Sequence, residues 1–196
     1  MIRNEYTPGL TTAKTPTALD GCLLTMTIQG FGALSKTTLS NTYQYVNLPR
    51  NIPACTILLE KVYAIISKAN RGGHNVIWTG DLNAVLNPAQ QLNYAPGGGL
   101  VVGDALLQKM VTKMGATNTP GQDKHAWQSK TGEQRAVLDH ILVSPPDLRV
   151  ESGGTFFTKD PRFDHAVRWI TVNGNDIGFH MVPNPTRTPF KPQIQR

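Results

Sequence analysis

Hydrophobic residues recur with two different periods along the chain, and together they predict a mixture of strands and helices. Apolar and polar positions alternate loosely in residues 21–30 (GCLLTMTIQG) and 36–46 (KTTLSNTYQYV), which is typical of strands, and residues 31–35 predict a hairpin connection between them. Between Pro53 and Asn70 the apolar residues have the spacing of one helix face, and the glycine pair at 72–73 predicts the end of that helix.

The second half of the chain continues this pattern and predicts a layered protein. Turn-rich surface loops are expected at residues 87–103 and 117–134. The remaining predicted elements, in chain order, are a strand at 76–78, a helix at Ala105–Met114, a strand at 137–144, a hairpin at 149–158 turning around Gly153–Gly154, and a last strand at 166–174. Strands that alternate with helices predict a layered sandwich of the α/β or α+β class.

Length and composition favour one domain. The 196 residues suit a single domain, and a hydrophobic fraction of 39% is enough for one sizeable core. We expect an irregular Thr/Pro-rich lead-in at residues 1–20, one domain at 21–173, and a basic, Pro-rich tail at 174–196. No internal repeat is visible.

Charge and cysteine content narrow the class of partner and the compartment. Nineteen Lys and Arg against thirteen Asp and Glu give a formal net charge of +6, which favours polyanions such as nucleic acid or acidic lipid headgroups, although such a charge also serves solubility alone. Cys22 and Cys55 form no metal-binding spacing and are expected to be reduced thiols. Without an apolar run of about 20 residues or a secretory signal, the sequence predicts an intracellular protein with no membrane segment, the nucleus being one location.

Three acidic motifs, each at the end of an apolar strand, are the candidates for chemistry: Gly80–Asn83 (GDLN), Leu138–His140 (LDH) and Phe163–His165 (FDH). Strand ends hold side chains in fixed positions at the edge of a sheet. Gathered carboxylates bind a hard cation such as Mg²⁺, an Asp beside a His fixes the imidazole tautomer, and Asn holds a phosphate oxygen without repelling it. This combination suits hydrolysis of a phosphate ester.

Each motif also has a purely structural interpretation. The segment GDLN is typical of a turn that closes a strand, and for this motif alone the turn is the stronger interpretation. His140 and His165 are explained equally well as polar residues at a strand edge, and Asp164 as the cap of a turn. Glu60 lies on the predicted helix and is expected to face solvent. Only the order and spacing of the motifs favour a site.

That ordered set of motifs resembles the endonuclease/exonuclease/phosphatase superfamily over residues 20–172. This superfamily includes abasic-site endonucleases, DNase I-like nucleases, sphingomyelinases and the endonucleases of non-LTR retrotransposons. The segments that carry the resemblance are SNTYQYV with Asn41 and Tyr43, VIWTGDLNAV with Asp81 and Asn83, HAWQSKTGEQRAVLDHILVS with Trp127, Arg135 and Asp139, and RFDHAVRWITV with Asp164 and His165.

The resemblance implies a DNase I-like α+β fold, a two-layer β-sandwich flanked by helices, and a role for each matched residue. Asp81 would orient or deprotonate the attacking water, and His165, with Asp139 behind it, would contact the scissile phosphate. Asn83 and Tyr43 would hold the phosphate, and Asp164 would lie near a Mg²⁺ or Mn²⁺ ion. The remaining matched residues, expected to contact substrate, are Asn41, Trp127 and Arg135.

The sequence also departs from the superfamily. An early Asn and a metal-binding Glu have no counterpart, so the N-terminal part of the domain is expected to be missing. Phe163 replaces the usual Ser, and Asn118 stands where some relatives have Asp. The first hypothesis is therefore a metal-dependent endonuclease of the retrotransposon type, acting on DNA rather than RNA. The second is a truncated, catalytically impaired fragment that at most binds nucleic acid. A phosphatase or lipid phosphodiesterase is a weaker third, and the oligomeric state stays open.

Overall fold

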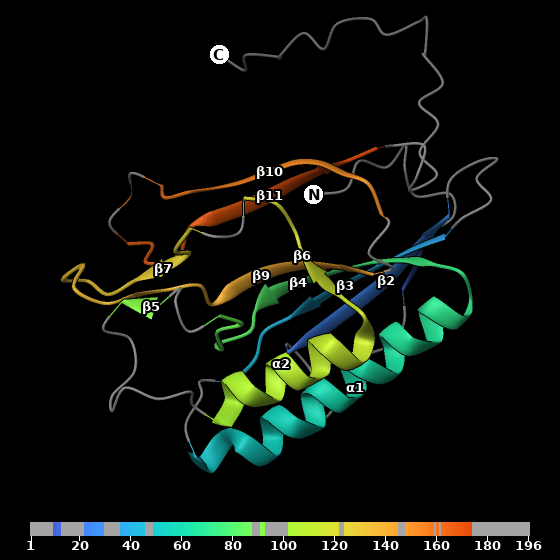
Figure 1. The fold of residues 1–196 in the computed structure, drawn as a ribbon, viewed down its shortest axis with the longest axis horizontal. Helices are drawn as coiled ribbons and strands as arrows, with labels where there is room; N and C mark the ends of the chain where they lie inside the picture. Colours follow the sequence, from blue (N-terminus) through green and yellow to red (C-terminus); the bar gives the residue numbers. More distant parts are fainter. Residues whose placement is uncertain are drawn as a thin grey trace, which may run out of the picture.

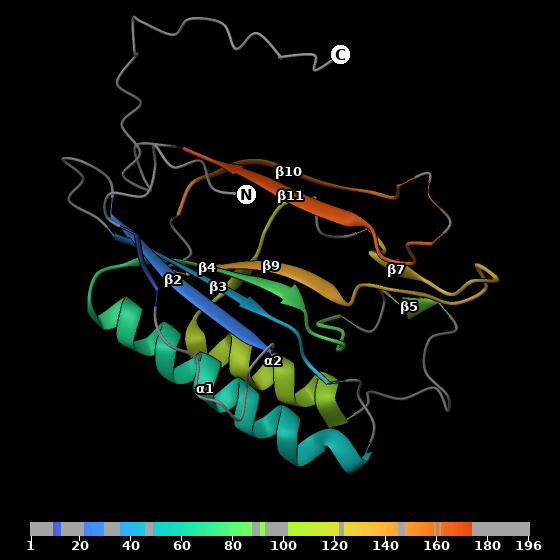
Figure 2. The ribbon, with the colours of Figure 1, turned by 180° about the vertical axis from the view of Figure 1, so that it is seen from behind.

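The computed structural model describes ten stretches of the chain, which are residues 10–12, 22–29, 36–45, 49–87, 91–92, 102–121, 124–144, 148–158, 160 and 162–173. Their main elements form three layers. A six-stranded sheet lies in the middle, two helices cover one of its faces, and a β-hairpin lies over the other face (Figures 1 and 2).

The central sheet is mixed and has the strand order β1-β2-β3-β4-β9-β6. Its strands are β1 (Leu10–Thr12), β2 (Leu23–Gln29), β3 (Lys36–Thr42), β4 (Asn75–Asp81), β9 (Asp139–Ser144) and β6 (Thr117–Asn118). β2 and β3 pair antiparallel, which confirms the predicted pairing, while the predicted connection 31–35 lies outside the described residues. β3 and β4 pair in parallel because a helix returns the chain to the starting edge between them.

The two helices bury one apolar stripe each against the sheet. After a 3-10 turn at Pro49–Asn51, α1 spans Ile52–Arg71 and ends at Gly72, as its apolar spacing predicts. α2 spans Val102–Met114, slightly longer than predicted. The main core lies between these helices and the sheet; among its fully enclosed side chains are Leu58, Val62, Trp78, Leu107 and Leu142.

The opposite face of the sheet is covered by the hairpin of β10 (Val150–Phe156) and β11 (Val167–Val172). A second core, with Ile77, Ile141 and Val143 from the sheet and Ile170 from the hairpin, joins the two layers. The predicted turn at Gly153–Gly154 is wrong, because both glycines lie inside β10. There they allow close contacts: a Cβ would lie 2.5 Å from the Pro120 carbonyl oxygen at Gly153, and 2.9 Å from the Trp169 indole nitrogen at Gly154.

A third, three-stranded sheet has the order β5-β8-β7, formed by Gln91–Leu92, Arg135–Ala136 and Trp127–Gln128. The segment 117–134, expected to be a loop, therefore contains the short strands β6 and β7. Residues 10–12 of the expected irregular lead-in pair with β2 as β1. The predicted tail at 174–196 lies outside the described residues.

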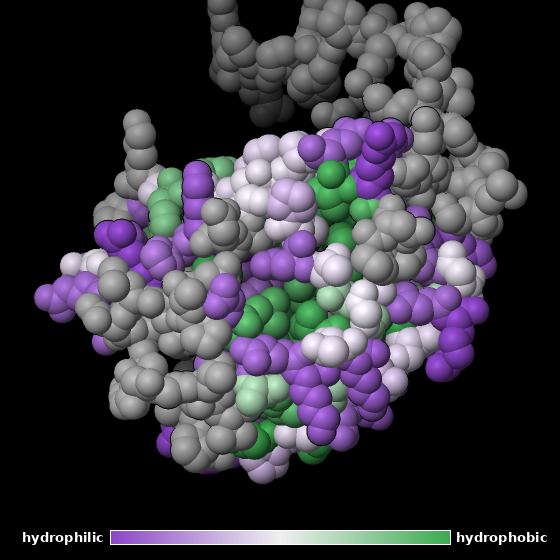
Figure 3. Space-filling view, in the orientation of Figure 1, coloured by the Kyte–Doolittle hydropathy of each residue, from purple (hydrophilic) through white to green (hydrophobic). Residues whose placement is uncertain are grey.

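The surface mixes polar and apolar residues, and apolar residues (green) reach it near the centre of the face shown in Figure 3. The large hydrophobic side chains that are exposed in the described residues are Leu24, Tyr43, Ile57, Phe156, Phe157, Phe163, Val167 and Trp169. Neither α1 nor α2 has the length and apolar content that a membrane-crossing helix needs. Cys22 and Cys55 are free thiols, as expected.

Gly80 offers a test of how tightly β3 and β4 are joined. It has φ +145°, and a Cβ there would lie 1.8 Å from the Thr42 carbonyl oxygen. Gly80→Ala is expected to lower the free energy of unfolding by about 3 kcal/mol or more, because it adds a backbone clash to an unfavourable conformation. The matched control is Gly132→Ala, where φ is +74° and nothing lies within 4 Å, with an expected loss of about 1 kcal/mol. Equal losses in urea denaturation would contradict the close approach.

Candidate active site

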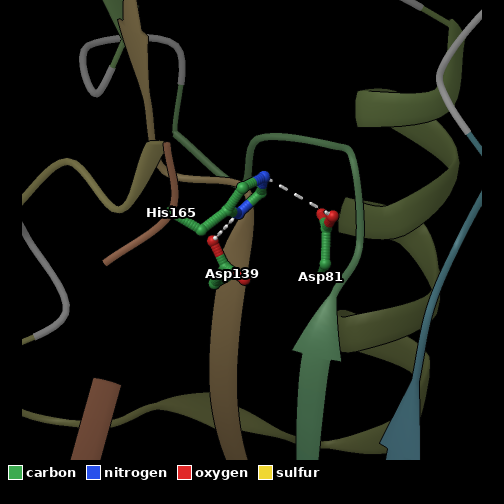
Figure 4. Close-up of side chains that lie close together, drawn as sticks. All are labelled: Asp81, Asp139 and His165. Atoms are coloured by element: carbon green, nitrogen blue, oxygen red, sulfur yellow. Dashed lines mark hydrogen bonds and ion pairs between the residues drawn. The ribbon is translucent and has the colours of Figure 1, made fainter. Parts of the chain in front are cut away.

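Three of the predicted residues meet at one end of the central sheet. His165 lies between two carboxylates: its Nδ1 is 2.8 Å from Asp139 Oδ2, and its Nε2 is 4.0 Å from Asp81 Oδ2 (Figure 4). All three side chains are partly accessible, with exposed fractions of 35% for His165, 22% for Asp139 and 15% for Asp81. The group is therefore open to solvent on one side and enclosed on the other.

Strand register brings the two carboxylates together. Asp81 ends β4, Asp139 begins β9, and the two residues are direct partners in this antiparallel pair. Side chains alternate between the faces of a strand, so Asp81 lies on the same face as Ile77, and Asp139 on the same face as Ile141. Both isoleucines belong to the core under the hairpin. The two carboxylates consequently lie on the hairpin side of the sheet, away from the helices.

His165 reaches the site from the segment that leads into β11. It forms an isolated antiparallel bridge with Trp127. On either side of it, the Ala166 amide donates to the Ala126 carbonyl at 2.6 Å, and the Gln128 amide donates to the Asp164 carbonyl at 3.1 Å. The Trp127 indole nitrogen also donates to Asp164 Oδ2 at 3.3 Å. The small sheet thus holds His165 through several bonds to its neighbours.

The charges in the group perturb one another. The pKa of Asp81 is raised from its ordinary value of 3.8 to about 6, first by burial and next by the charge of Asp139. The pKa of His165 is also raised, chiefly by its hydrogen bond to Asp139. A carboxylate whose pKa lies near neutrality next to an imidazole that favours the charged state is an arrangement suited to proton transfer.

Asn83 lies in the turn directly after Asp81, in the left-handed conformation with φ +45°. Its backbone amide donates to Asp81 Oδ1 at 3.0 Å, and its side-chain Nδ2 donates to the Gln44 carbonyl at 2.7 Å. Gly80 and Asp81 therefore lie inside β4, and the chain turns only after them, where the Asn83 amide orients the Asp81 carboxylate. Sequence reasoning missed Gln44, whose side chain is fully buried; its place directly after Tyr43, in the matched segment SNTYQYV, was the available signal.

Three of the residues predicted to contact substrate lie on or near strands β3 and β8. Asn41 is exposed on β3, and its Oδ1 accepts a hydrogen bond from Thr79 Oγ1 at 3.1 Å. Tyr43 is 53% exposed just beyond the end of β3, and the next residue is tied to Asp81 through a backbone bond of 2.8 Å. Arg135 is exposed on β8. Their roles in binding substrate stay predictions.

His140, the other histidine of the LDH motif, lies on the opposite face of the sheet from the site. It is 1% exposed, and its Nε2 is 2.9 Å from the Ala84 carbonyl oxygen. Burial lowers its pKa to about 4, so the imidazole is neutral near pH 7 and Nε2–H is the donor to that carbonyl. His140 is thus a buried hydrogen-bonding residue, neither at the edge of the sheet nor among the side chains that converge at the site.

The group has the chemistry of a cation site. One ligand atom each from Asp81, Asp139 and His165 lies within 4.8 Å of the others. Burial first, and next the facing charge of Asp139, raise the pKa of Asp81, and a divalent cation bound here would reduce the repulsion between the two carboxylates. Asp164, which the resemblance assigns to the metal, is exposed and lies just before His165. Its assignment as a ligand stays a prediction.

Comparison with known proteins identifies the family. The model of the Endonuclease/Exonuclease/phosphatase family matches residues 9–177. This chain belongs to the endonuclease/exonuclease/phosphatase family. The match confirms the superfamily predicted from the motifs and includes Asp81, Asp139 and His165. No curated protein matches the chain by sequence.

Solved structures of endonuclease/exonuclease/phosphatase proteins share the fold. The 3′ phosphatase NExo from Neisseria, solved with a product DNA hairpin, has a TM-score of 0.61 at 16% identity, over 85% of this chain and 71% of that one. The AP endonuclease of Archaeoglobus fulgidus has a TM-score of 0.62 at 16% identity, over 84% and 70%. The endonuclease domain of TRAS1, a telomere-specific non-LTR retrotransposon, has a TM-score of 0.58 at 15% identity, over 83% of this chain and 68% of that one. The DNase I-like fold class is confirmed, in a chain shorter than these.

The raised pKa of Asp81 predicts a stability penalty for its ionised form. Between about pH 4 and 6 the folded chain keeps a proton that the unfolded chain has released, so the free energy of unfolding falls as pH rises through this window. Asp81→Asn removes the charge and is expected to stabilise the metal-free protein by about 2 kcal/mol at pH 8, and by much less at pH 4. Chemical denaturation in EDTA at both pH values measures this. The control Glu60→Gln removes a carboxylate from the exposed face of α1 and should not raise the free energy of unfolding.

The bond between His165 and Asp139 predicts a loss of stability with rising pH in a higher pH window than that of Asp81. A His with a raised pKa contributes stability below its unfolded pKa of about 6.5, and this contribution is lost as pH rises through the folded pKa. Asp139→Asn is expected to lower the pKa of His165 and to destabilise the fold more at pH 6 than at pH 9. NMR titration of the imidazole signals measures the pKa. An unchanged pKa in Asp139→Asn, with Asp160→Asn as the control, would contradict the pairing.

Proposed function

We propose that this family member is a divalent-metal-dependent phosphodiester hydrolase that cuts nucleic acid as an endonuclease. The observation that supports the proposal best is the convergence of Asp81, Asp139 and His165 at one end of the sheet, although they come from distant parts of the chain. Membership of the endonuclease/exonuclease/phosphatase family also supports a phosphodiesterase that acts on nucleic acid.

Asp81 is the proposed group that orients or deprotonates the attacking water. Its pKa of about 6 makes it a base that is mostly ionised at neutral pH and still able to accept a proton. The backbone amide of Asn83 fixes Oδ1, which leaves Oδ2 facing His165. A water bound at this oxygen is held in one position, and that placement is the larger part of catalysis in phosphoryl transfer.

His165 is the proposed group that stabilises the negative charge developing on the phosphate. Asp139 occupies Nδ1 at 2.8 Å and favours the protonated ring, so Nε2–H is directed toward the side where Asp81 lies. A charged donor aimed at a phosphoryl oxygen favours the transition state over the ground state because charge accumulates there during attack. Asp139 acts through His165 and is therefore a positioning residue.

Further polar groups around the trio are proposed to bind the substrate. One amide hydrogen of Asn83 is taken by the Gln44 carbonyl, and the second remains for a phosphate oxygen. The exposed Tyr43 hydroxyl is the second proposed phosphate contact. The proposed contacts with neighbouring nucleotides are Asn41, Trp127 and Arg135.

Asp164 is the proposed carboxylate ligand of a Mg²⁺ or Mn²⁺ ion, as the resemblance implies, and the group of Asp81, Asp139 and His165 would offer further ligand atoms. Such an ion would neutralise charge on the phosphate and lower the pKa of bound water. Nucleic acid is the proposed substrate because the chain carries a net charge of +6 and NExo was solved with DNA. DNA is favoured over RNA, and a retrotransposon origin is part of the proposal.

Nicking of supercoiled plasmid tests the proposed endonuclease directly. The purified chain is expected to nick DNA with Mg²⁺ or Mn²⁺ and to stop on addition of EDTA. Asp81→Ala and His165→Ala should each lower the rate by about 100-fold or more, because each removes a group that acts on the reacting atoms.

His74→Ala is the matched control for the histidine variant. His74 precedes β4, at the end of that strand opposite the site, where its Nδ1 lies 3.0 Å from Thr38 Oγ1. This variant should fold and nick at the unmodified rate. Metal-independent nicking, or full activity in Asp81→Ala, would indicate a contaminating nuclease and contradict the proposal.

A nucleic-acid-binding chain without turnover is the second candidate function. The aligned region spans 71%, 68% and 70% of the three compared chains. This function would be supported over the first if the chain binds DNA but does not nick it in Mg²⁺ or Mn²⁺. The logarithm of the binding constant should then fall linearly with the logarithm of the salt concentration.

A further inference from the structure

The turn that follows Asp81 is unusual because it is buried. Leu82, Ala84 and Val85 are 0% exposed, and Asn83 is 7% exposed. A buried turn leaves backbone N–H and C=O groups away from water, and each of them needs a partner inside the protein. The partners chosen for this turn show what holds the Asp81 carboxylate in place.

Three side chains from outside the turn supply partners on its helix side. His140 Nε2 lies 2.9 Å from the Ala84 carbonyl oxygen, and Asp104 Oδ1 accepts from the Val85 amide at 2.8 Å. Gln108 Nε2 donates to the Leu86 carbonyl at 2.9 Å. We call these three side chains the clamp; its members are His140 of β9 and Asp104 and Gln108 of α2.

The other bonds of the turn lead to the site itself. The Leu82 amide donates to the Leu138 carbonyl at 2.9 Å, and the Asn83 amide donates to Asp81 Oδ1 at 3.0 Å. Asn83 has a positive φ, a conformation that costs a residue other than glycine about 1 kcal/mol or more and persists only where its surroundings enforce it. The clamp belongs to those surroundings, because its three side chains bond to the backbone of the next three residues, 84–86.

Two successive residues of β9 contact the two parts of the site, which are His165 and the turn after Asp81. Asp139 faces the hairpin side and holds His165 at 2.8 Å, while His140 faces the helices and holds the turn after Asp81. Both contacts leave the same strand end, where Asp139 pairs with Asp81 and His140 with Gly80. Two adjacent residues of β9 therefore contact both His165 and the turn after Asp81.

We propose that His140 is a positioning residue for the hydrolase, which fixes the Asp81–Asn83 turn from the far side of the sheet together with Asp104 and Gln108. This inference rests on the proposed function for its kinetic consequence only. Without the His140 donor the Ala84 carbonyl is left buried and unpaired, the turn shifts to find another partner, and the Asp81 carboxylate moves with it. Displacement of a catalytic group by about 1 Å lowers a rate by about 100-fold.

The kinetic test compares His140→Phe with Ser144→Ala. Phe keeps a ring in the core but removes the donor. Ser144 lies on the same strand and the same face, is 2% exposed, and bonds to Asn70 Nδ2 at 2.9 Å and to the Met114 carbonyl at 3.3 Å, at the end of β9 away from the site. Both variants lose buried hydrogen bonds, so both should be less stable. Only His140→Phe should lower kcat, by about 10- to 100-fold with little change in KM.

A rescue variant separates the donor from the shape of the side chain. His140→Gln restores an N–H donor of similar reach and is expected to recover most of the lost kcat. An unmodified kcat in His140→Phe, or an equal loss in Ser144→Ala, overturns the proposal. If His140→Phe fails to fold, Gln108→Ala removes another clamp bond from a half-buried position and is expected to lower kcat in the same way.

Hydrogen exchange provides a measurement that needs no activity. The amides of Asn83 and Val85 should exchange about 10-fold faster in His140→Phe than in the unmodified protein, after normalisation to the core amide of Leu142. Ser144→Ala should leave this ratio unchanged. If the unmodified protein never nicks DNA, the proposed function fails, but hydrogen exchange still tests whether His140 holds the turn. Equal acceleration of exchange in His140→Phe and Ser144→Ala overturns the role proposed for His140.

Discussion

Two carboxylates placed directly opposite each other on neighbouring strands are the constraint on which the rest of this site depends. Like charges in such a pair destabilise a sheet, and burial of Asp81 increases the penalty. The imidazole of His165 offsets part of it, because Asp139 favours the charged ring. Burial and the charge of Asp139 raise the pKa of Asp81, and the hydrogen bond to Asp139 raises the pKa of His165. A divalent cation bound here would reduce the repulsion between the two carboxylates.

The arrangement exists only in one strand register. A slip of one residue in β9 would move Asp139 to the helix side and His140 to the site, since successive side chains point to opposite faces. Apolar alternation does not exclude this slip, because β9 is apolar on both faces: Leu142 packs in the core under the helices, and Ile141 in the core under the hairpin. What opposes the slip is that it would bring the Asp139 carboxylate into the core under the helices and remove His140 from the buried Ala84 carbonyl.

The long elements were predictable from sequence because each has a periodic apolar face and a clear stop. α1 ends at Gly72, and β2 and β3 pair as expected. The interior of β10 was not predictable, since two adjacent glycines usually indicate a turn, and only the contacts of Gly153 and Gly154 with distant residues explain them as strand positions. Two-residue strands such as β6 and β7 are too short to leave a period.

The site illustrates the same limit at the level of single residues. Local motifs identified Asp81, Asp139 and His165 as candidates, but their convergence was implied only by family resemblance, because it depends on strand order. The segment DHILVS is apolar on both faces after its first two residues, so its pattern does not indicate which of Asp139 and His140 faces the site. The answer comes from the layers. His165 arrives with the hairpin layer, and the hairpin packs on Ile141, two residues from Asp139 on the same face. The side of β9 that binds the hairpin is thus necessarily the side that meets His165, and His140 is left to the helices.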